Sequence, residues 1–87
     1  MTQNIAGHPL ETSGDGFHVV AVVARPGGEA AIRVALVPNR SALDVRLFRR
    51  GKPGRTWRPT PAGFRILSDQ VPEFLVALEA AVRELGE

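Results

Sequence analysis

The sequence predicts an α+β fold in which a four-stranded antiparallel, curved sheet is followed by one C-terminal helix, in the order ββββα. Three observations lead to this prediction. Four segments rich in β-branched or alternating apolar residues are separated by short turns that contain Pro, Gly or Asn. The C-terminal segment carries an apolar stripe at helical spacing. The length of 87 residues fits one small domain, so we expect the helix to cover one sheet face in a two-layer arrangement.

Each predicted strand ends at a turn signal. The strands are expected over residues 17–25, 30–37, 42–50 and 56–67, separated by turns at 26–28 and 38–41 and by a flexible basic connection at 51–55. The last of these strands contains Pro59 and Pro61, which have no backbone N–H to donate to a neighbouring strand. It must therefore lie at the sheet edge, or be interrupted and resume near Gly63.

The third strand has two chemically different faces. Leu43, Val45 and Leu47 alternate with Asp44, Arg46, Phe48 and Arg50. In one interpretation the aliphatic face packs on the core, and the opposite face presents arginines and a ring to solvent, as a single-strand binder requires. In the other, Phe48 sits at the sheet edge as ordinary packing and Asp44 neutralises Arg46. The single tryptophan, Trp57, is likewise either a core residue or a ring that contacts the ligand.

The C-terminal helix is expected to be capped by Ser68 or Asp69, with Pro72 in its first turn. Its apolar stripe consists of Val71, Phe74, Leu75, Leu78, Val82 and Leu85. Alanines at 77, 80 and 81 allow a second helix to approach closely. We therefore expect a dimer interface at Phe74, Leu78, Ala81, Val82 and Leu85.

Small size raises the question of what stabilises the domain. Residues 1–16 are polar and without periodicity, so we expect a disordered tail and a single domain over 17–87. The chain has no cysteine, and its two histidines, His8 and His18, have no third ligand at useful spacing. Because disulfides are excluded, and neither a metal nor a cofactor is expected, a homodimer is the expected route to adequate stability.

Charge is distributed unevenly along the chain. Residues 25–65 contain ten basic and two acidic residues, whereas residues 68–87 contain five acids and one arginine. Such a basic block is typical of polyanion binding, although a merely solvated basic face is the alternative.

The sequence contains neither an apolar span nor a signal pattern, which favours the cytoplasm, or the nucleoid in a bacterium. No residues are arranged as a nucleophile with its base, so no enzymatic activity and no small-molecule substrate are expected.

Two motifs resemble those of a known family. Residues 43–46 (Leu-Asp-Val-Arg) are followed by Phe48, and residues 58–66 read Arg-Pro-x-x-x-Gly-Phe-x-Ile. With the terminal helix, this order is similar to the transcriptional coactivator family called positive cofactor four, over residues 30–85. The resemblance implies a helix-mediated homodimer whose sheets hold single-stranded DNA. Arg40, Arg46, Arg58 and Gly63 match family positions, whereas Pro61-Ala62 replaces a basic pair and Arg49 replaces a ring.

The resulting hypothesis is non-catalytic, largely sequence-independent binding of single-stranded DNA or RNA in transcription regulation or in DNA repair and replication, with transcription or repair proteins as further partners. The residues expected to bind are Arg40, Arg46, Phe48, Arg49, Arg55, Trp57, Arg58 and Arg65. The alternative is a protein-interaction module whose basic sheet face docks an acidic partner. Binding to a duplex groove is disfavoured, because the one expected helix is acidic.

Overall fold

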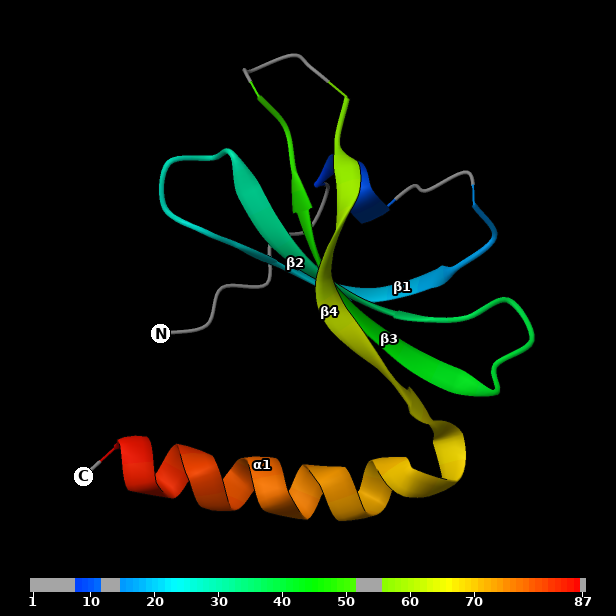
Figure 1. The fold of residues 1–87 in the computed structure, drawn as a ribbon, viewed down its shortest axis with the longest axis vertical. Helices are drawn as coiled ribbons and strands as arrows, with labels where there is room; N and C mark the ends of the chain where they lie inside the picture. The colour runs from blue at the N-terminus through cyan, green and yellow to red at the C-terminus, as the bar shows by residue number, and fades with distance from the viewer. Residues whose placement is uncertain (1–7, 12–14, 52–55, 87) are drawn as a thin grey trace.

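The computed structural model describes residues 8–11, 15–51 and 56–86 and confirms the predicted ββββα fold (Figure 1). The elements are η1 (Pro9–Glu11), β1 (His18–Ala24), β2 (Ala30–Leu36), β3 (Ala42–Arg49), β4 (Arg58–Leu67), η2 (Ser68–Gln70) and α1 (Val71–Leu85). The strands pair antiparallel in the order β1-β2-β3-β4. Each strand therefore pairs with its sequence neighbours, and β1 and β4 form the two edges.

The proline-containing strand β4 lies at a sheet edge, as predicted. It is not interrupted, but its register with β3 shifts: Arg46 pairs with Gly63, whereas Phe48 pairs with Pro59. The additional β4 residues form a bulge, which the hydroxyl of Thr60 stabilises by donating to the Leu47 carbonyl (2.8 Å) and accepting from the Ala62 N–H (3.1 Å). The bulge thus accommodates both prolines without breaking the strand.

The strand register divides the sheet into two faces of different composition. The face named here the arginine face carries Val22, Ala31, Arg33, Ala35, Asp44, Arg46, Phe48 and Arg65. The face named the aliphatic face carries Val23, Ile32, Val34, Leu36, Leu43, Val45, Leu47, Phe64 and Ile66. Because side chains alternate along each strand, the register assigns every residue to one face.

The arginine face is the covered one, which decides between the two interpretations of β3. Leu10 of η1 packs with Val22, Ala31 and Phe48 in a buried cluster, to which Trp57 adds a half-buried ring. Phe48 is 6% exposed, so it does not face solvent as a stacking platform. The alternative, in which Phe48 is ordinary packing and Asp44 neutralises Arg46, is the one that the structure shows.

Residues at the N-terminal end provide this cover. Residues 8–11 and 15–16 were expected to belong to a disordered tail, but η1 and Asp15 lie against the sheet. The remainder of the expected tail, residues 1–7 and 12–14, lies outside the described residues. The expectation failed for η1 because a single buried apolar residue, Leu10, carries no periodicity that a sequence pattern could detect.

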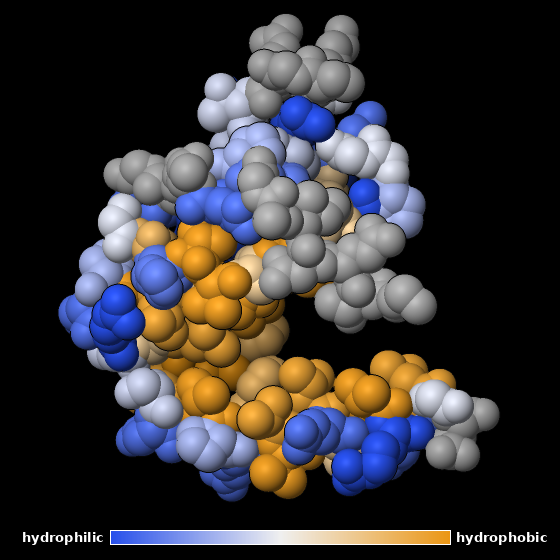
Figure 2. All heavy atoms as spheres, turned by 180° about the vertical axis from the view of Figure 1, so that it is seen from behind, coloured by the Kyte–Doolittle hydropathy of each residue, from blue (hydrophilic) through white to orange (hydrophobic). Residues whose placement is uncertain are grey.

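The aliphatic face lies opposite α1 but is not closed by it. The rings of Phe64 on β4 and Phe74 on α1 have centroids 5.6 Å apart. None of the α1 residues, all of which are described, is buried. Figure 2 shows apolar side chains of the sheet and of α1 on the two sides of an open hollow. The two layers are present, and the described residues do not fill the space between their apolar surfaces.

The start of α1 differs from the prediction. Gln70 is the N-cap and makes no side-chain capping hydrogen bond, while Ser68 and Asp69 lie in η2. The Ser68 N–H donates to the Ser41 carbonyl (2.9 Å), which extends the β3–β4 pairing and delays the helix. Pro72 lies in the first helical turn, as expected.

Candidate nucleic-acid interface

The residues expected to bind nucleic acid do not form one surface. Arg46, Phe48 and Arg65 lie in the covered arginine face, whereas Arg49 and Arg58 lie at one end of the β3–β4 hairpin. Trp57 lies between these two groups, and Arg40 lies in a distant turn. Arg55 lies outside the described residues.

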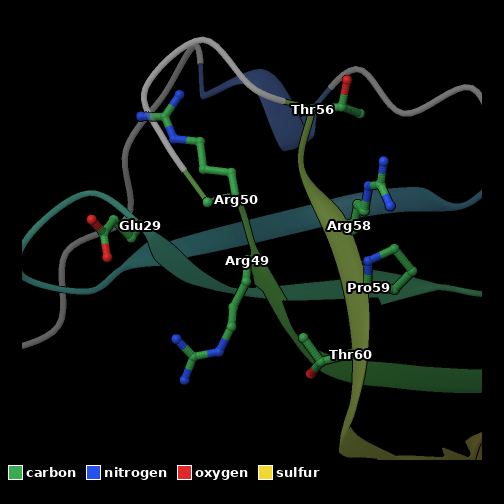
Figure 3. A pocket seen from close by; sticks show the side chains of 8 residues that line it. Glu29, Arg49, Arg50, Thr56, Arg58, Pro59 and Thr60 are labelled. Carbon is green, nitrogen blue, oxygen red and sulfur yellow. The ribbon is translucent and has the colours of Figure 1, made fainter.

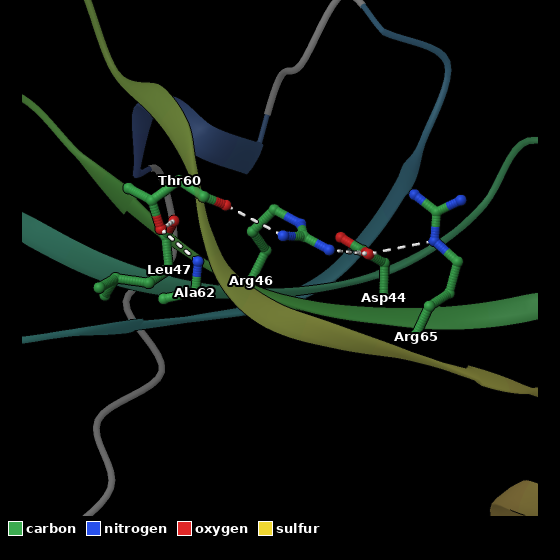
Figure 4. A network of polar contacts seen from close by, with 6 residues as sticks. All are labelled: Asp44, Arg46, Leu47, Thr60, Ala62 and Arg65. Atoms are coloured by element: carbon green, nitrogen blue, oxygen red, sulfur yellow. Dashed lines mark hydrogen bonds and ion pairs between the residues drawn. The ribbon is translucent and has the colours of Figure 1, made fainter.

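Asp44 engages two of the expected phosphate-binding arginines (Figure 4). Its Oδ1 accepts from Arg46 Nη2 at 3.3 Å and from Arg65 Nε at 3.2 Å. Arg46 also donates from Nη1 to the Thr60 carbonyl at 3.0 Å. The Asp44 side chain is only 2% exposed, so its charge is compensated by these two guanidinium groups and not by water. Arg65 is half exposed and keeps donors that face solvent.

Arg33 is a buried cation that the sequence reasoning did not select as a site residue. It lies opposite Arg46 in the β2–β3 register, and its guanidinium carbon is 4.6 Å from the ring centre of Phe48 and 4.9 Å from that of Phe17. Its Nη1 donates to Asp15 Oδ2 at 3.2 Å. Its position between Ala31 and Ala35 was the available signal, since it places an arginine on the same face as Arg46.

The exposed arginines meet at the end of the β3–β4 hairpin. A hollow of about 740 Å³, named here the basic hollow, lies beside this end (Figure 3). It is lined by Glu29, Arg49, Arg50, Gly51, Thr56, Arg58, Pro59 and Thr60. Three cations and one acid give the hollow a net positive charge. Its cationic guanidinium groups are suited to bind an anion.

Arg49 and Arg58 are direct cross-strand partners in the basic hollow. Like charges directly opposite one another destabilise a sheet. Both side chains are exposed, and neither has a hydrogen bond or ion pair to another described side chain. Figure 3 shows their side chains pointing in different directions, so an anion in the hollow would be attracted by both charges without lying directly between them.

Trp57 connects the basic hollow to the arginine face. The guanidinium carbon of Arg50, which lines the hollow, is 4.7 Å from the Trp57 ring centre. The His8 ring is 5.0 Å from the same tryptophan, at 55° to it. Burial of His8 lowers its pKa below the ordinary value; the Arg50 cation lowers it further, and Glu11 acts in the opposite direction. Trp57 is therefore already in contact with two side chains of its own chain.

Arg40 is separated from the other expected residues. It is exposed in the turn before β3, at a φ of 60°, and its N–H donates to the Val37 carbonyl at 2.8 Å. The eight residues of β3 place it roughly 25 Å from Arg49 at 3.3 Å per residue. It is too far away to bind the same phosphate as the basic hollow.

The expected dimer residues lie on α1. Leu78, Ala81, Val82 and Leu85 are exposed, and Phe74 is half-buried against Phe64.

The described part of the chain contains no cluster of three or more His, Asp or Glu side chains that could hold a metal ion. Within the same residues, no helix is both long enough and apolar enough to cross a membrane. No family model, curated protein or solved structure matches the chain.

Proposed function

We propose that this protein binds single-stranded DNA or RNA without base-specific readout and without chemistry, and that a phosphate of the strand binds in the basic hollow. The observation that carries the proposal is the exposed pair Arg49 and Arg58, which are cross-strand partners on β3 and β4 and both line that hollow. Such a pair costs stability in the free protein, and an anion offsets that cost.

The surroundings of the pair support a nucleic acid over a small anion. Arg50 adds a third cation and lies over the Trp57 ring, so phosphate-binding and stacking groups are adjacent. The basic residues are concentrated in 25–65, whereas three acids of the C-terminal segment, Glu73, Glu79 and Glu84, lie on α1. The resemblance to the coactivator family favours the same ligand, with a role in transcription or repair in the cytoplasm or nucleoid.

Fluorescence anisotropy with labelled single-stranded oligonucleotides tests the proposal. Wild type is compared with Arg49→Gln and Arg58→Gln, and Arg83→Gln on the acidic helix α1 is the matched control. We expect each hollow variant to lose about fivefold in affinity, roughly 1 kcal/mol. The slope of log affinity against log salt should become shallower by about 0.7 for each phosphate that the variant no longer neutralises.

Three outcomes would contradict this proposal. Binding that does not change between low and moderate salt would exclude phosphate contacts as its source. An equal loss from Arg83→Gln would mean that only net charge matters. Binding of an acidic peptide, with no response to oligonucleotides, would favour the alternative of a basic protein-docking face.

We also propose that the protein acts as a homodimer in which a second copy covers the exposed stripe of α1. Leu75, Leu78, Val82 and Leu85 are all exposed in the single chain, opposite an aliphatic sheet face that is itself only half-buried. A chain of 87 residues without cysteine needs another source of stability than disulfides. In a twofold dimer the same apolar patch on both copies is buried at once, which makes a second copy the best-fitting occupant.

A further inference from the structure

The N-terminal residues that cover the arginine face make contacts of three kinds. We name residues 8–11 and 15–17 the strap. Leu10 packs against Phe48, and the His8 ring packs on Trp57. Asp15 forms an ion pair with Arg33, and the Phe17 ring lies next to the same guanidinium group. The strap thus places rings, an apolar group and a carboxylate on arginines and aromatic rings.

The groups under the strap are those that bind single strands elsewhere. The strap contacts Arg33 and Arg65 and the rings of Phe48 and Trp57. The same face also carries Arg46, with Asp44 as the one acid. Single-strand binders combine arginines for phosphates with rings for bases. A carboxylate on Arg33 provides the same charge-assisted hydrogen bond that a phosphate oxygen would, and a ring on Trp57 occupies the place of a base.

The strap leaves some hydrogen-bond donors near this face without an acceptor. Among the described residues, two buried side-chain polar atoms lack a hydrogen-bond partner: Arg33 Nε and Trp57 Nε1. Both belong to side chains that the strap contacts, through Asp15 and His8. A buried donor without an acceptor is unfavourable. The oxygens of a phosphate and the acceptor atoms of a base could satisfy both donors.

The basic hollow and the covered face are physically continuous. Arg50 lines the hollow and lies over the Trp57 ring, and another neighbour of that ring is His8 of the strap. A strand bound in the basic hollow at Arg50 would next meet Trp57, where the strap now lies. Further extension along the same path would lead to Arg33.

We infer that the arginine face is a second part of the single-strand site, and that the strap occupies it as an internal competitor which a nucleic acid displaces. On displacement, a phosphate replaces the Asp15 carboxylate at Arg33, and a base replaces His8 at Trp57. The inference rests on the proposed function, since it names how access to the same site is regulated. It explains why a face with this composition is buried in the free chain.

The test uses the full-length chain and a substitution that weakens the strap without truncating it. Asp15→Asn removes the charge that competes with phosphate but retains an oxygen that can accept from the Phe17 N–H, as Asp15 does at 3.0 Å. Glu79→Gln on α1 is the control, because it changes net charge by the same amount away from the face. The double variant Leu10→Ala/Asp15→Asn also weakens the apolar contact. Circular dichroism confirms that each variant is folded.

We expect Asp15→Asn to bind a single-stranded oligonucleotide about threefold more tightly than Glu79→Gln, and the double variant more tightly still, because a larger fraction of molecules is open for binding. Emission from Trp57, the only tryptophan, reports whether its surroundings change on binding. In wild type, saturating oligonucleotide should shift this emission.

Each remaining outcome either supports or overturns the inference. Equal or weaker binding by Asp15→Asn, relative to Glu79→Gln, overturns the inference. If wild type still binds and Arg58→Gln still weakens that binding, the basic hollow stands alone. Binding by the double variant but not by wild type supports a strap that blocks the site completely. An oligonucleotide that binds none of these proteins overturns both the inference and the proposed function.

Discussion

The two faces of the sheet are covered in the opposite way from what their composition suggests. The arginine face, on which Arg33 and Asp44 are buried and Arg46 is half-buried, is covered by residues of its own chain. The aliphatic face, with Val45 and Leu47, is only half-buried, and α1 opposite it has no buried residue. What is buried in a single chain is therefore decided by which segment can reach a face, and not by hydrophobicity alone.

Burial of the arginine face is possible because its charges are compensated internally. Asp44 binds Arg46 and Arg65, and Asp15 binds Arg33, whose guanidinium also lies against two rings. Such networks offset the cost of removing charges from water only when every member is paired. The aliphatic face requires no such network, which leaves it free to pack against a second copy.

The largest effect is expected from Asp44→Ala. It would leave Arg46, whose side chain is 22% exposed, without its carboxylate. We therefore expect a cost at the lower end of the about 3–5 kcal/mol typical of removing one partner of a buried pair. Urea unfolding monitored by Trp57 fluorescence measures the loss. Arg65→Gln is the control, because its side chain is 53% exposed and should cost roughly 1 kcal/mol or less. A loss from Asp44→Ala as small as the loss from Arg65→Gln would mean that this network does not stabilise the arginine face.

The aliphatic side of the comparison is tested by Leu78→Asp. Leu78 is 46% exposed in the single chain, so little stability should be lost within one copy. In a dimer the same change places a charge in the interface and removes about 1.5–3 kcal/mol of burial per copy. Light scattering coupled to size exclusion should show a dimer for wild type and for Glu79→Gln, and a monomer for Leu78→Asp. A wild-type monomer at all concentrations would refute the homodimer.

Close packing between β3 and β4 is tested by Gly63→Ala. An added Cβ at Gly63 would lie 2.5 Å from the Val45 carbonyl oxygen and 2.9 Å from the Arg46 Cα, both of which are backbone atoms. We expect a loss of about 1–3 kcal/mol, typical of overpacking, because neither atom can move without shifting β3. Gly51→Ala is the control, since its added Cβ meets nothing within 4 Å. Thermal unfolding of both variants distinguishes them.

The smallest effect is expected from pH, through His8 of the strap. Its pKa is lowered in the folded chain, first by burial and then by Arg50, so strap packing favours the neutral ring. The Leu10 N–H also donates to His8 Nδ1 at 3.1 Å, an acceptor that protonation removes. Packing of the strap should be complete above the unfolded pKa of about 6.5 and weaken as pH falls below it. Trp57 emission should follow this change, and His8→Gln should abolish it.

The strands were predicted closely because their signals are local. Each of β1, β2 and β3 ends within one residue of the predicted bounds, since Pro, Gly and Asn mark the turns between them. The helix cap was wrong, because Ser68 donates to Ser41, a residue of the preceding turn that only pairing of β3 with β4 brings close. Arg49 and Arg58 were both expected to bind the ligand, and the same pairing places them together.

The sequence by itself determined that the strands have two unlike faces, that arginine is concentrated in the sheet, and that the C-terminal helix is amphipathic, because alternation and periodicity are properties of neighbouring residues. Only the tertiary structure decided which face is covered. Alternation is the same whichever face turns inward, and the choice depends on Leu10 and Asp15, which come from a segment without periodicity. Asp15 and Arg33 are 18 positions apart in the sequence, and the hydrogen bond between them holds the N-terminal segment on the arginine face. The pattern of β3 does not predict this contact.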